Sequence, residues 1–306
     1  MAAVGNPQAK ARKDALALYL FLAFGITWLL WLVSILLVGR KGYLLPAPGN
    51  MIVLFQSGFQ NSEHLLVSII FSLAVYGPLI AGILAIRREQ GEAGLARLWK
   101  SVFSFRIGRR WLLNAILIAL VLALLPFLLA AVTGWIANPG ALFNALWPYF
   151  FPILIWQILT SGFGEEPGWR GYLLPKLQSR FEGEKAIWVL GFIWAAWHYP
   201  FTIYWTTTLA VGMSGAALAI TLFTALAGFT ISIVGITYLY TWFYNHTGSV
   251  HLAIIFHAFA NTFPVIFSTS GVPQLAFITG FMPWLVVFFL QWRLGKEAFP
   301  GRPFTG

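Results

Sequence analysis

The 306-residue sequence contains no cysteine and only one aspartate, Asp14. The first absence excludes a cysteine nucleophile, a disulfide bond and thiolate ligands for a metal. The second excludes a membrane aspartyl protease, because that class needs two aspartates. Charged residues are also scarce, at 9% of the chain against about 25% in typical soluble domains. Since 59% of the residues are hydrophobic, a bilayer rather than water is the expected solvent.

Apolar runs of roughly 20 residues, the length that spans a bilayer, recur along the whole chain. We predict eight of them, at residues 15–39, 65–86, 111–135, 143–164, 186–206, 214–244, 250–268 and 276–292. The first run is much longer than the signal-peptide h-region of roughly 7–15 residues, so it is predicted to be a retained span. No repeat and no linker is evident. Residues 1–306 are therefore predicted to form one all-α, polytopic transmembrane bundle.

Basic residues predict the orientation of this bundle, because loops rich in Lys and Arg stay in the cytoplasm. With the N-terminus inside, only Arg40 and Lys41 fall outside. The other seventeen fall inside: Lys10, Arg12, Lys13, Arg87, Arg88, Arg97, Lys100, Arg106, Arg109, Arg110, Arg170, Lys176, Arg180, Lys185, Arg293, Lys296 and Arg302. Both termini are therefore expected to be cytoplasmic. Because these charges lie between apolar spans, membrane lipids rather than nucleic acid are the predicted partners.

Polar residues at membrane depth cost about 2.5–3.5 kcal/mol each, so the few that occur there need a reason. The first group is Glu165, Glu166 and Arg170, near the inner end of the fourth span. Glu166 and Arg170 are four residues apart and can pair on one helix face. Glu165 lacks that local partner and could serve as a general base. An ordinary Glu–Arg ion pair at a helix end explains the group equally well. Pro167 predicts a kink or a fresh helix start here.

The second and third groups are His198 in the fifth span, and His257 with Asn261 in the seventh. Taken alone, His198 is more typical of a hydrogen-bonded packing residue. His257 and Asn261 share a helix face, where they could donate hydrogen bonds to an oxyanion or clamp two helices together. The predicted topology places all three groups between the inner surface and mid-membrane. We therefore expect them to meet in one polar cavity that opens to the cytoplasmic side.

Three motifs containing these residues resemble those of the CAAX-protease and bacteriocin-processing family, which includes the type II CAAX prenyl endopeptidases. They are Glu165-Glu166-Pro167-Gly168-Trp169-Arg170 for Glu-Glu-x-x-x-Arg, Trp194-Ala195-Ala196-Trp197-His198 for aromatic-x-x-x-His, and His257-Ala258-Phe259-Ala260-Asn261 for His-x-x-x-Asn. Tryptophan at 194, where eukaryotic members usually have Phe, is similar to the prokaryotic branch. The resemblance covers about residues 150–265, and the motif-bearing core is placed at about 143–268.

The resemblance implies an intramembrane endopeptidase that hydrolyses a peptide bond near the C-terminus of a membrane-anchored or prenylated substrate. It implies that Glu165 and His198 activate water, that His257 and Asn261 stabilise the oxyanion, and that Glu166 and Arg170 support the site. No cofactor is expected, and the absence of a His-Glu-x-x-His motif favours a mechanism without a metal. The alternative is a non-catalytic bacteriocin self-immunity or membrane scaffold protein of the same fold.

Two other features are interpreted as non-catalytic. The segment Gly212-Met213-Ser214-Gly215 matches the Gly-x-Ser-Gly of rhomboid serine proteases. The predicted topology places Ser214 near the outer surface and His257 in the inner half, so the two are not expected to form a dyad. His64, His246 and His251 fall at span ends or in loops, and are expected to be solvated or interfacial.

The charge bias makes a direct prediction about topology. A reporter fused after Arg88 should be cytoplasmic, and one fused near Gly49 should be external, because basic loops are retained inside. Paired fusions, one active only in the cytoplasm and one only outside it, measure both positions. The reverse pattern would overturn the orientation, and with it the cytoplasmic opening of the cavity.

Overall fold

The computed structural model describes residues 14–269, 272, 275–295 and 298–299, which are helical or irregular and contain no strand. The helices are α1 (Leu16–Lys41), η1 (Pro48–Asn50), α2 (Met51–Ser57), α3 (Ser62–Leu73), η2 (Ala74–Tyr76), α4 (Gly77–Val102), α5 (Arg109–Val132), α6 (Pro139–Leu146), η3 (Trp147–Tyr149), α7 (Phe150–Gln157), η4 (Ile158–Gly162), α8 (Phe163–Gly168), η5 (Trp169–Leu173), α9 (Leu174–Gln178), α10 (Lys185–Leu209), α11 (Gly215–Thr247), α12 (Val250–Ile266) and α13 (Leu275–Leu294). Of the basic residues assigned to the inside, Lys10, Arg12, Lys13, Lys296 and Arg302 lie outside the described residues.

Seven helical segments in the described part of the chain are long and apolar enough to cross a membrane. They are Leu16–Val38, Ser62–Val102, Arg109–Val132, Pro139–Gln178, Lys185–Leu209, Gly215–Thr247 and Phe277–Leu294. α12 is a shorter apolar helix of 17 residues, roughly 26 Å long and close to the thickness of the hydrocarbon core. Each of the eight predicted spans thus corresponds to a helix, and the protein is a multi-pass membrane protein.

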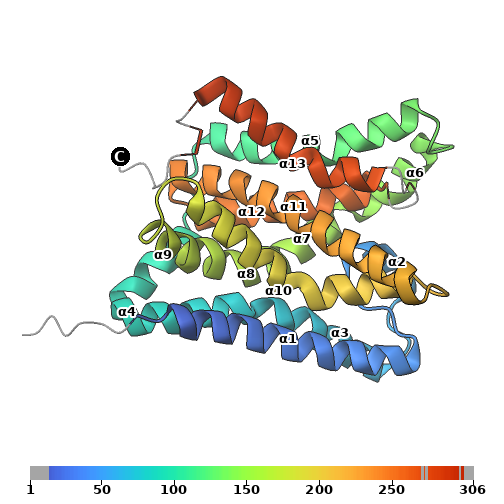
Figure 1. The fold of residues 1–306 in the computed structure, drawn as a ribbon, viewed down its shortest axis with the longest axis horizontal. Coiled ribbons are helices and arrows are strands. Elements are labelled where there is room, and N and C mark those ends of the chain that lie inside the picture. Colours follow the sequence, from blue (N-terminus) through green and yellow to red (C-terminus); the bar gives the residue numbers. More distant parts are fainter. Residues whose placement is uncertain (1–13, 270–271, 273–274, 296–297, 300–306) are drawn as a thin grey trace, which may run out of the picture.

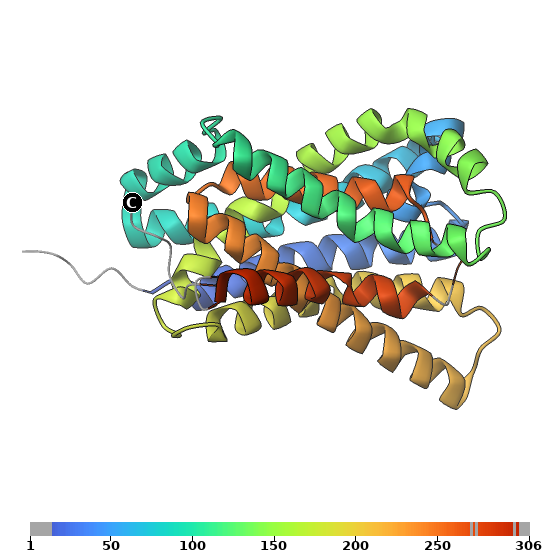
Figure 2. The ribbon, with the colours of Figure 1, turned by 90° about the horizontal axis from the view of Figure 1, so that it is seen from above.

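Successive spans run in alternating directions (Figures 1 and 2). The links at 103–108, 179–184 and 248–249 therefore lie at one end of the bundle, which we call the basic end. The links at 42–61, 133–138 and 210–214 lie at the opposite end. One residue assigned to the basic loops is misplaced, because Arg170 is fully buried and pairs with Glu166. It is part of the interior, so it does not count toward the charge bias.

The motif-bearing segment from α7 to α9 is a continuous helix with two wide turns. Both η4 and η5 are π-helical, and they lie on either side of α8, which carries Glu165 and Glu166. The kink or fresh start predicted at Pro167 does not occur, since Pro167 lies inside α8 with helical neighbours. The missing N–H of proline is accommodated by wide turns rather than by a break.

Glycine lets α8 lie unusually close to α4. A methyl group at Gly168 would overlap the backbone carbonyl of Pro78, and one at Gly164 would lie 2.9 Å from the carbonyl oxygen of Val75. On the facing side, a methyl at Gly82 would lie 3.2 Å from the Cα atom of Gly168. Small residues at such contacts let two membrane helices approach at backbone distance. This contact fixes the position of α8 relative to the first half of the bundle.

A polar cluster at the basic end ties α1, α4 and the α7–α9 segment together. The carboxylate of Glu89 accepts hydrogen bonds from the Ala15 N–H at 2.6 Å, the Tyr172 hydroxyl at 3.0 Å and the Lys176 ammonium at 2.7 Å. Asp14 pairs with Arg180 close by. These contacts fix the end of η5 and the start of α1.

The connection between α1 and α3, at the opposite end, folds back into the bundle. Leu45, Ala47 and Met51 are buried, and His64 holds the preceding chain in place. The His64 Nδ1 atom accepts from the Gln60 N–H at 3.1 Å, so Nε2 carries the proton and donates to the Leu44 carbonyl at 2.8 Å. The prediction that His64 is solvated or interfacial is therefore wrong, because the side chain is buried and backbone groups of the connection satisfy both ring nitrogens.

Candidate active site

The predicted site residues come from three parts of the chain. Glu165 and Glu166 lie on α8, His198 lies on α10, and His257 lies on α12. Glu165, Glu166, His257 and the Arg170 side chain on η5 are all buried. The structure therefore brings the first and third motifs into direct contact and places the second beside them.

Glu166 is the centre of a buried charged cluster. Its Oε1 atom accepts from Arg170 Nη1 at 3.0 Å and from His257 Nδ1 at 2.7 Å. The guanidinium of Arg170 lies between two aromatic rings, 4.3 Å from the centroid of Trp194 and 3.9 Å from that of Tyr240. The predicted i,i+4 pair is present. The two aromatic rings cover the guanidinium, whose Nε and Nη2 atoms form no hydrogen bond with the described residues.

Glu165 faces away from this pair and is held by two indoles instead. Its Oε2 atom accepts from Trp194 Nε1 at 2.9 Å and from Trp169 Nε1 at 3.3 Å. The other oxygen, Oε1, lies 4.0 Å from His257 Nε2. As expected, Glu165 has no arginine partner. The two indoles fix one oxygen, so that the other points toward the imidazole.

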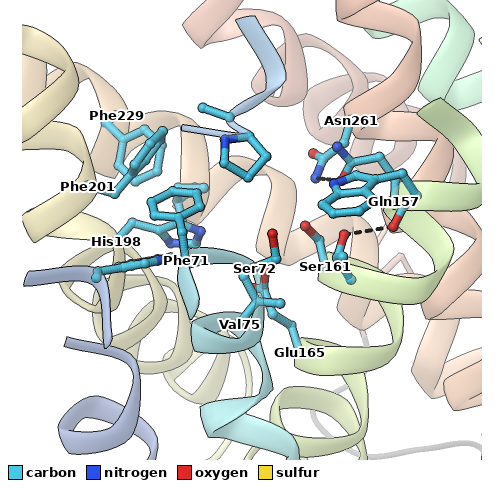
Figure 3. Close-up of a pocket in the computed structure, with 16 residues that line it drawn as sticks. Phe71, Ser72, Val75, Gln157, Ser161, Glu165, His198, Phe201, Phe229 and Asn261 are labelled. Carbon is cyan, nitrogen blue, oxygen red and sulfur yellow. Dashed lines mark hydrogen bonds between the residues drawn. The ribbon is translucent and has the colours of Figure 1, made fainter. Parts of the chain in front are cut away.

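A cavity of about 230 Å³ opens beside Glu165 (Figure 3). His198 and Asn261 also line it, so three of the four predicted catalytic residues lie on its wall, and the fourth, His257, lies next to Glu165. The His198 ring is fixed by its Nδ1 atom, 2.8 Å from the Trp194 carbonyl, and by contact with Phe229. Figure 3 shows His198 and Phe229 on one side of the cavity and Asn261 on the other.

Comparison with known proteins finds matches to this part of the chain. Residues 145–263 match the family described as "Type II CAAX prenyl endopeptidase Rce1-like". The matched segment contains the three motifs and all six predicted site residues. This segment, which we call the Rce1-like core, is similar to that family. A curated relative, "CAAX prenyl protease 2" of Methanococcus maripaludis, is 34% identical over 113 residues, which is 37% of this chain. The aligned segment spans 39% of that relative's length.

The Rce1-like core contains a further polar residue that sequence reasoning missed, Gln157. The side-chain oxygen of Gln157, Oε1, accepts a hydrogen bond from Asn261 Nδ2 at 3.1 Å. Gln157 is itself buried and lines the cavity. This bond orients the Asn261 carboxamide and leaves its second N–H available. The available signal was an amide side chain in the apolar fourth span, two helical turns before Glu165. A neutral amide in an apolar span is a weaker sign of a functional site than an ionisable group, because it costs less free energy to bury.

The wall of the cavity toward the opposite end is formed by the connection between α1 and α3. Pro46 and Ala47 line it, and Ala47 is buried. The predicted opening of the Rce1-like core toward the cytoplasm stays a prediction. Ser214 caps α11 at the opposite end and is exposed, and it does not line this cavity.

Metal binding can be judged from the donor set. No group of three or more His, Cys, Asp or Glu side chains in the described ranges is arranged to hold a metal ion. In the Rce1-like core, Glu166 and His257 bond to each other, and Glu165 uses one oxygen for the indoles. Glu165 Oε1 and His257 Nε2 face each other at 4.0 Å, which provides two ligands where a catalytic zinc site has three protein ligands.

From the buried cluster we predict that Glu166 contributes to the free energy of unfolding, separately from any role in catalysis. Glu166→Gln removes the negative charge that the Arg170 guanidinium and the His257 ring both face, so the buried guanidinium loses its charged partner. We expect a loss of about 3–5 kcal/mol and a fall in melting temperature of about 10 °C. Glu182→Gln is the matched control, because Glu182 is exposed in the link before α10 and should leave the melting temperature unchanged. Equal melting curves for the two variants would contradict a structural role for Glu166.

Proposed function

We propose that the protein is an intramembrane endopeptidase of the CAAX prenyl protease type. It hydrolyses a peptide bond near the C-terminus of a membrane-anchored substrate, with water activated by Glu165 and without a metal. The observation that carries the proposal is the 4.0 Å separation between Glu165 Oε1 and His257 Nε2 beside the cavity. A water that makes hydrogen bonds of about 2.8 Å to both atoms fits such a gap.

The charges of the cluster support this arrangement. A carboxylate only accepts hydrogen bonds, so His257 Nδ1 carries a hydrogen and donates a hydrogen bond to Glu166. With Nε2 protonated as well, the buried cluster holds two carboxylates, one guanidinium and one imidazolium, and its charges cancel. A neutral total matters because an uncompensated charge at this depth is costly. The protonated His257 then offers Nε2–H to an oxygen in the cavity.

The proposed reaction proceeds through addition and elimination. Glu165 takes a proton from the water while the water oxygen bonds to the scissile carbonyl carbon. The carbonyl oxygen becomes an oxyanion and accepts from His257 Nε2–H and from the second N–H of Asn261. The C–N bond then breaks, and the proton on Glu165 passes to the leaving amine. His198, fixed through Nδ1, helps Glu165 to hold the water.

Cleavage of a farnesylated CAAX peptide by the purified protein tests whether Glu165 is the general base. Glu165→Gln keeps the size of the side chain and an acceptor for the indoles, but removes its basicity. Turnover should fall by about 100- to 10,000-fold, with the melting temperature kept. His257→Ala and Asn261→Ala should each lower turnover by about 100- to 1,000-fold. Glu182→Gln is again the control and should cut at the wild-type rate.

Two outcomes of this assay would contradict the proposal. If Glu165→Gln cuts as fast as the wild-type protein, Glu165 is not the base. If the wild-type protein cuts no substrate, and all site variants still give its cellular phenotype, the protein is a scaffold or immunity protein.

The metal-independent mechanism has its own test. Because no three donors around Glu165 are arranged to hold a metal ion, we expect cleavage to survive prolonged treatment with a strong chelator. The purified protein should contain much less than one zinc per chain, measured by elemental analysis. Loss of activity on chelation, restored by added zinc, would make Glu165, His198 and His257 candidate ligands instead.

A further inference from the structure

A second cavity lies at the basic end, away from the candidate active site. Its volume is about 380 Å³, larger than the cavity beside Glu165. It forms where α4 ends, α5 begins and α11 turns into α12. Figures 1 and 2 show the last part of α4 crossing this end of the bundle. The change in direction occurs at Gly91, whose φ of 66° interrupts the helix.

Three basic side chains line this cavity: Arg97, Lys100 and Arg106. No acidic side chain lines it, and among the described residues none of the three forms an ion pair. Arg97 donates to the neutral side chain of Gln90 at 2.8 Å. Three cations around one cavity repel each other, and an anion between them removes that repulsion. The hydroxyl group of Ser104, which also lines the cavity, adds a possible donor.

The wall of the cavity is held in place by hydrogen bonds between segments far apart in the sequence. Ser101 Oγ donates to the Gly248 carbonyl at 2.8 Å and accepts from the Val250 N–H at 2.9 Å. The His251 ring bonds to the Val102 carbonyl at 2.9 Å. The turn itself requires glycine, since Gly248 has a φ of 62°. The backbone on this side of the cavity is therefore fixed, and the three basic side chains that line the cavity are exposed.

Aromatic residues beside the cations indicate that the anion comes from the membrane. Phe103 and Phe105, in the same link as Arg106, are 56% and 77% exposed. Trp111 lines the cavity and lies against the ring of His246, with centroids 5.1 Å apart. Exposed aromatic rings next to basic side chains are typical of a segment in the headgroup region, where the rings reach toward the acyl chains. A soluble anion would gain nothing from the exposed phenylalanines.

We propose that this cavity binds the phosphate headgroup of an anionic phospholipid. Arg97, Lys100 and Arg106 would contact the phosphate oxygens, and the exposed rings of Phe103 and Phe105 would lie along the first part of the acyl chains. The inference is independent of the proposed peptidase activity. It rests on the cations, the formed wall and the exposed rings, none of which takes part in that site.

Native mass spectrometry of the purified protein in detergent tests the proposal, with titration of dioctanoyl phosphatidylglycerol. Dioctanoyl phosphatidylcholine tests the need for net negative charge, and glycerol 3-phosphate and inorganic phosphate test the need for a lipid. Lys100→Gln with Arg106→Gln removes two charges from the cavity. Arg88→Gln with Arg110→Gln removes two exposed charges that do not line it. Melting temperature without lipid checks that both variants fold.

We expect one phosphatidylglycerol to bind the wild-type protein with a defined affinity, and phosphatidylcholine to bind much more weakly. The cavity variant should lose about 30-fold in affinity, as each cation near a lipid surface contributes roughly five-fold. The control variant should bind like the wild type. An equal loss in both double variants would mean general surface attraction and overturn the proposal. Equally tight binding of glycerol 3-phosphate or inorganic phosphate would overturn the assignment to a lipid.

Discussion

The buried ion pair of Glu166 and Arg170 is the interaction on which the rest of this core depends. Charges at this depth need compensating partners, and here those partners come from three other helices. Arg170 needs the rings of Trp194 and Tyr240, and Glu166 needs the imidazole of His257. The pair therefore specifies how α8, α10, α11 and α12 meet. The buried pair contributes to the specificity of helix packing more than to the free energy of unfolding, because a well-packed apolar pair would cost less free energy to bury.

Close helix packing makes this arrangement possible. The contact between α8 and α4 through Gly82, Gly164 and Gly168 leaves no room for side chains on that face. The polar side chains of α8 are therefore directed to its other faces, toward α10 and α12. The conformational freedom of glycine is a cost in most helices, but in this one the cost is offset by a backbone contact that a larger residue would prevent.

Much of the site could be predicted from the sequence because its key relationships are local. Glu166 and Arg170 are four residues apart, and a helix brings such residues together whatever surrounds it. The spans were also predictable, since hydrophobic length is a property of single segments. The Trp194 indole at Glu165, the imidazole at Glu166 and the Gln157 amide at Asn261 come from other helices, so spacing along one segment carries no information about them. Trp169, the other indole at Glu165, is four residues further along the same segment. His64 was assigned wrongly for the same reason, since its partners belong to a connection whose fold the sequence pattern did not predict.

The two wide turns around α8 have a consequence for how this segment can vary. A π turn holds one residue more than the α-helical turn that it replaces. Deleting one residue therefore converts the π turn into an ordinary α-helical turn. Such a deletion within residues 158–162 would rotate the following helix by about 100° relative to the preceding one. Both carboxylates would then leave His257, although every motif residue would still be present at its usual spacing within each motif. The length of the segment between Gln157 and Phe163 is thus as much a part of the site as the glutamates themselves.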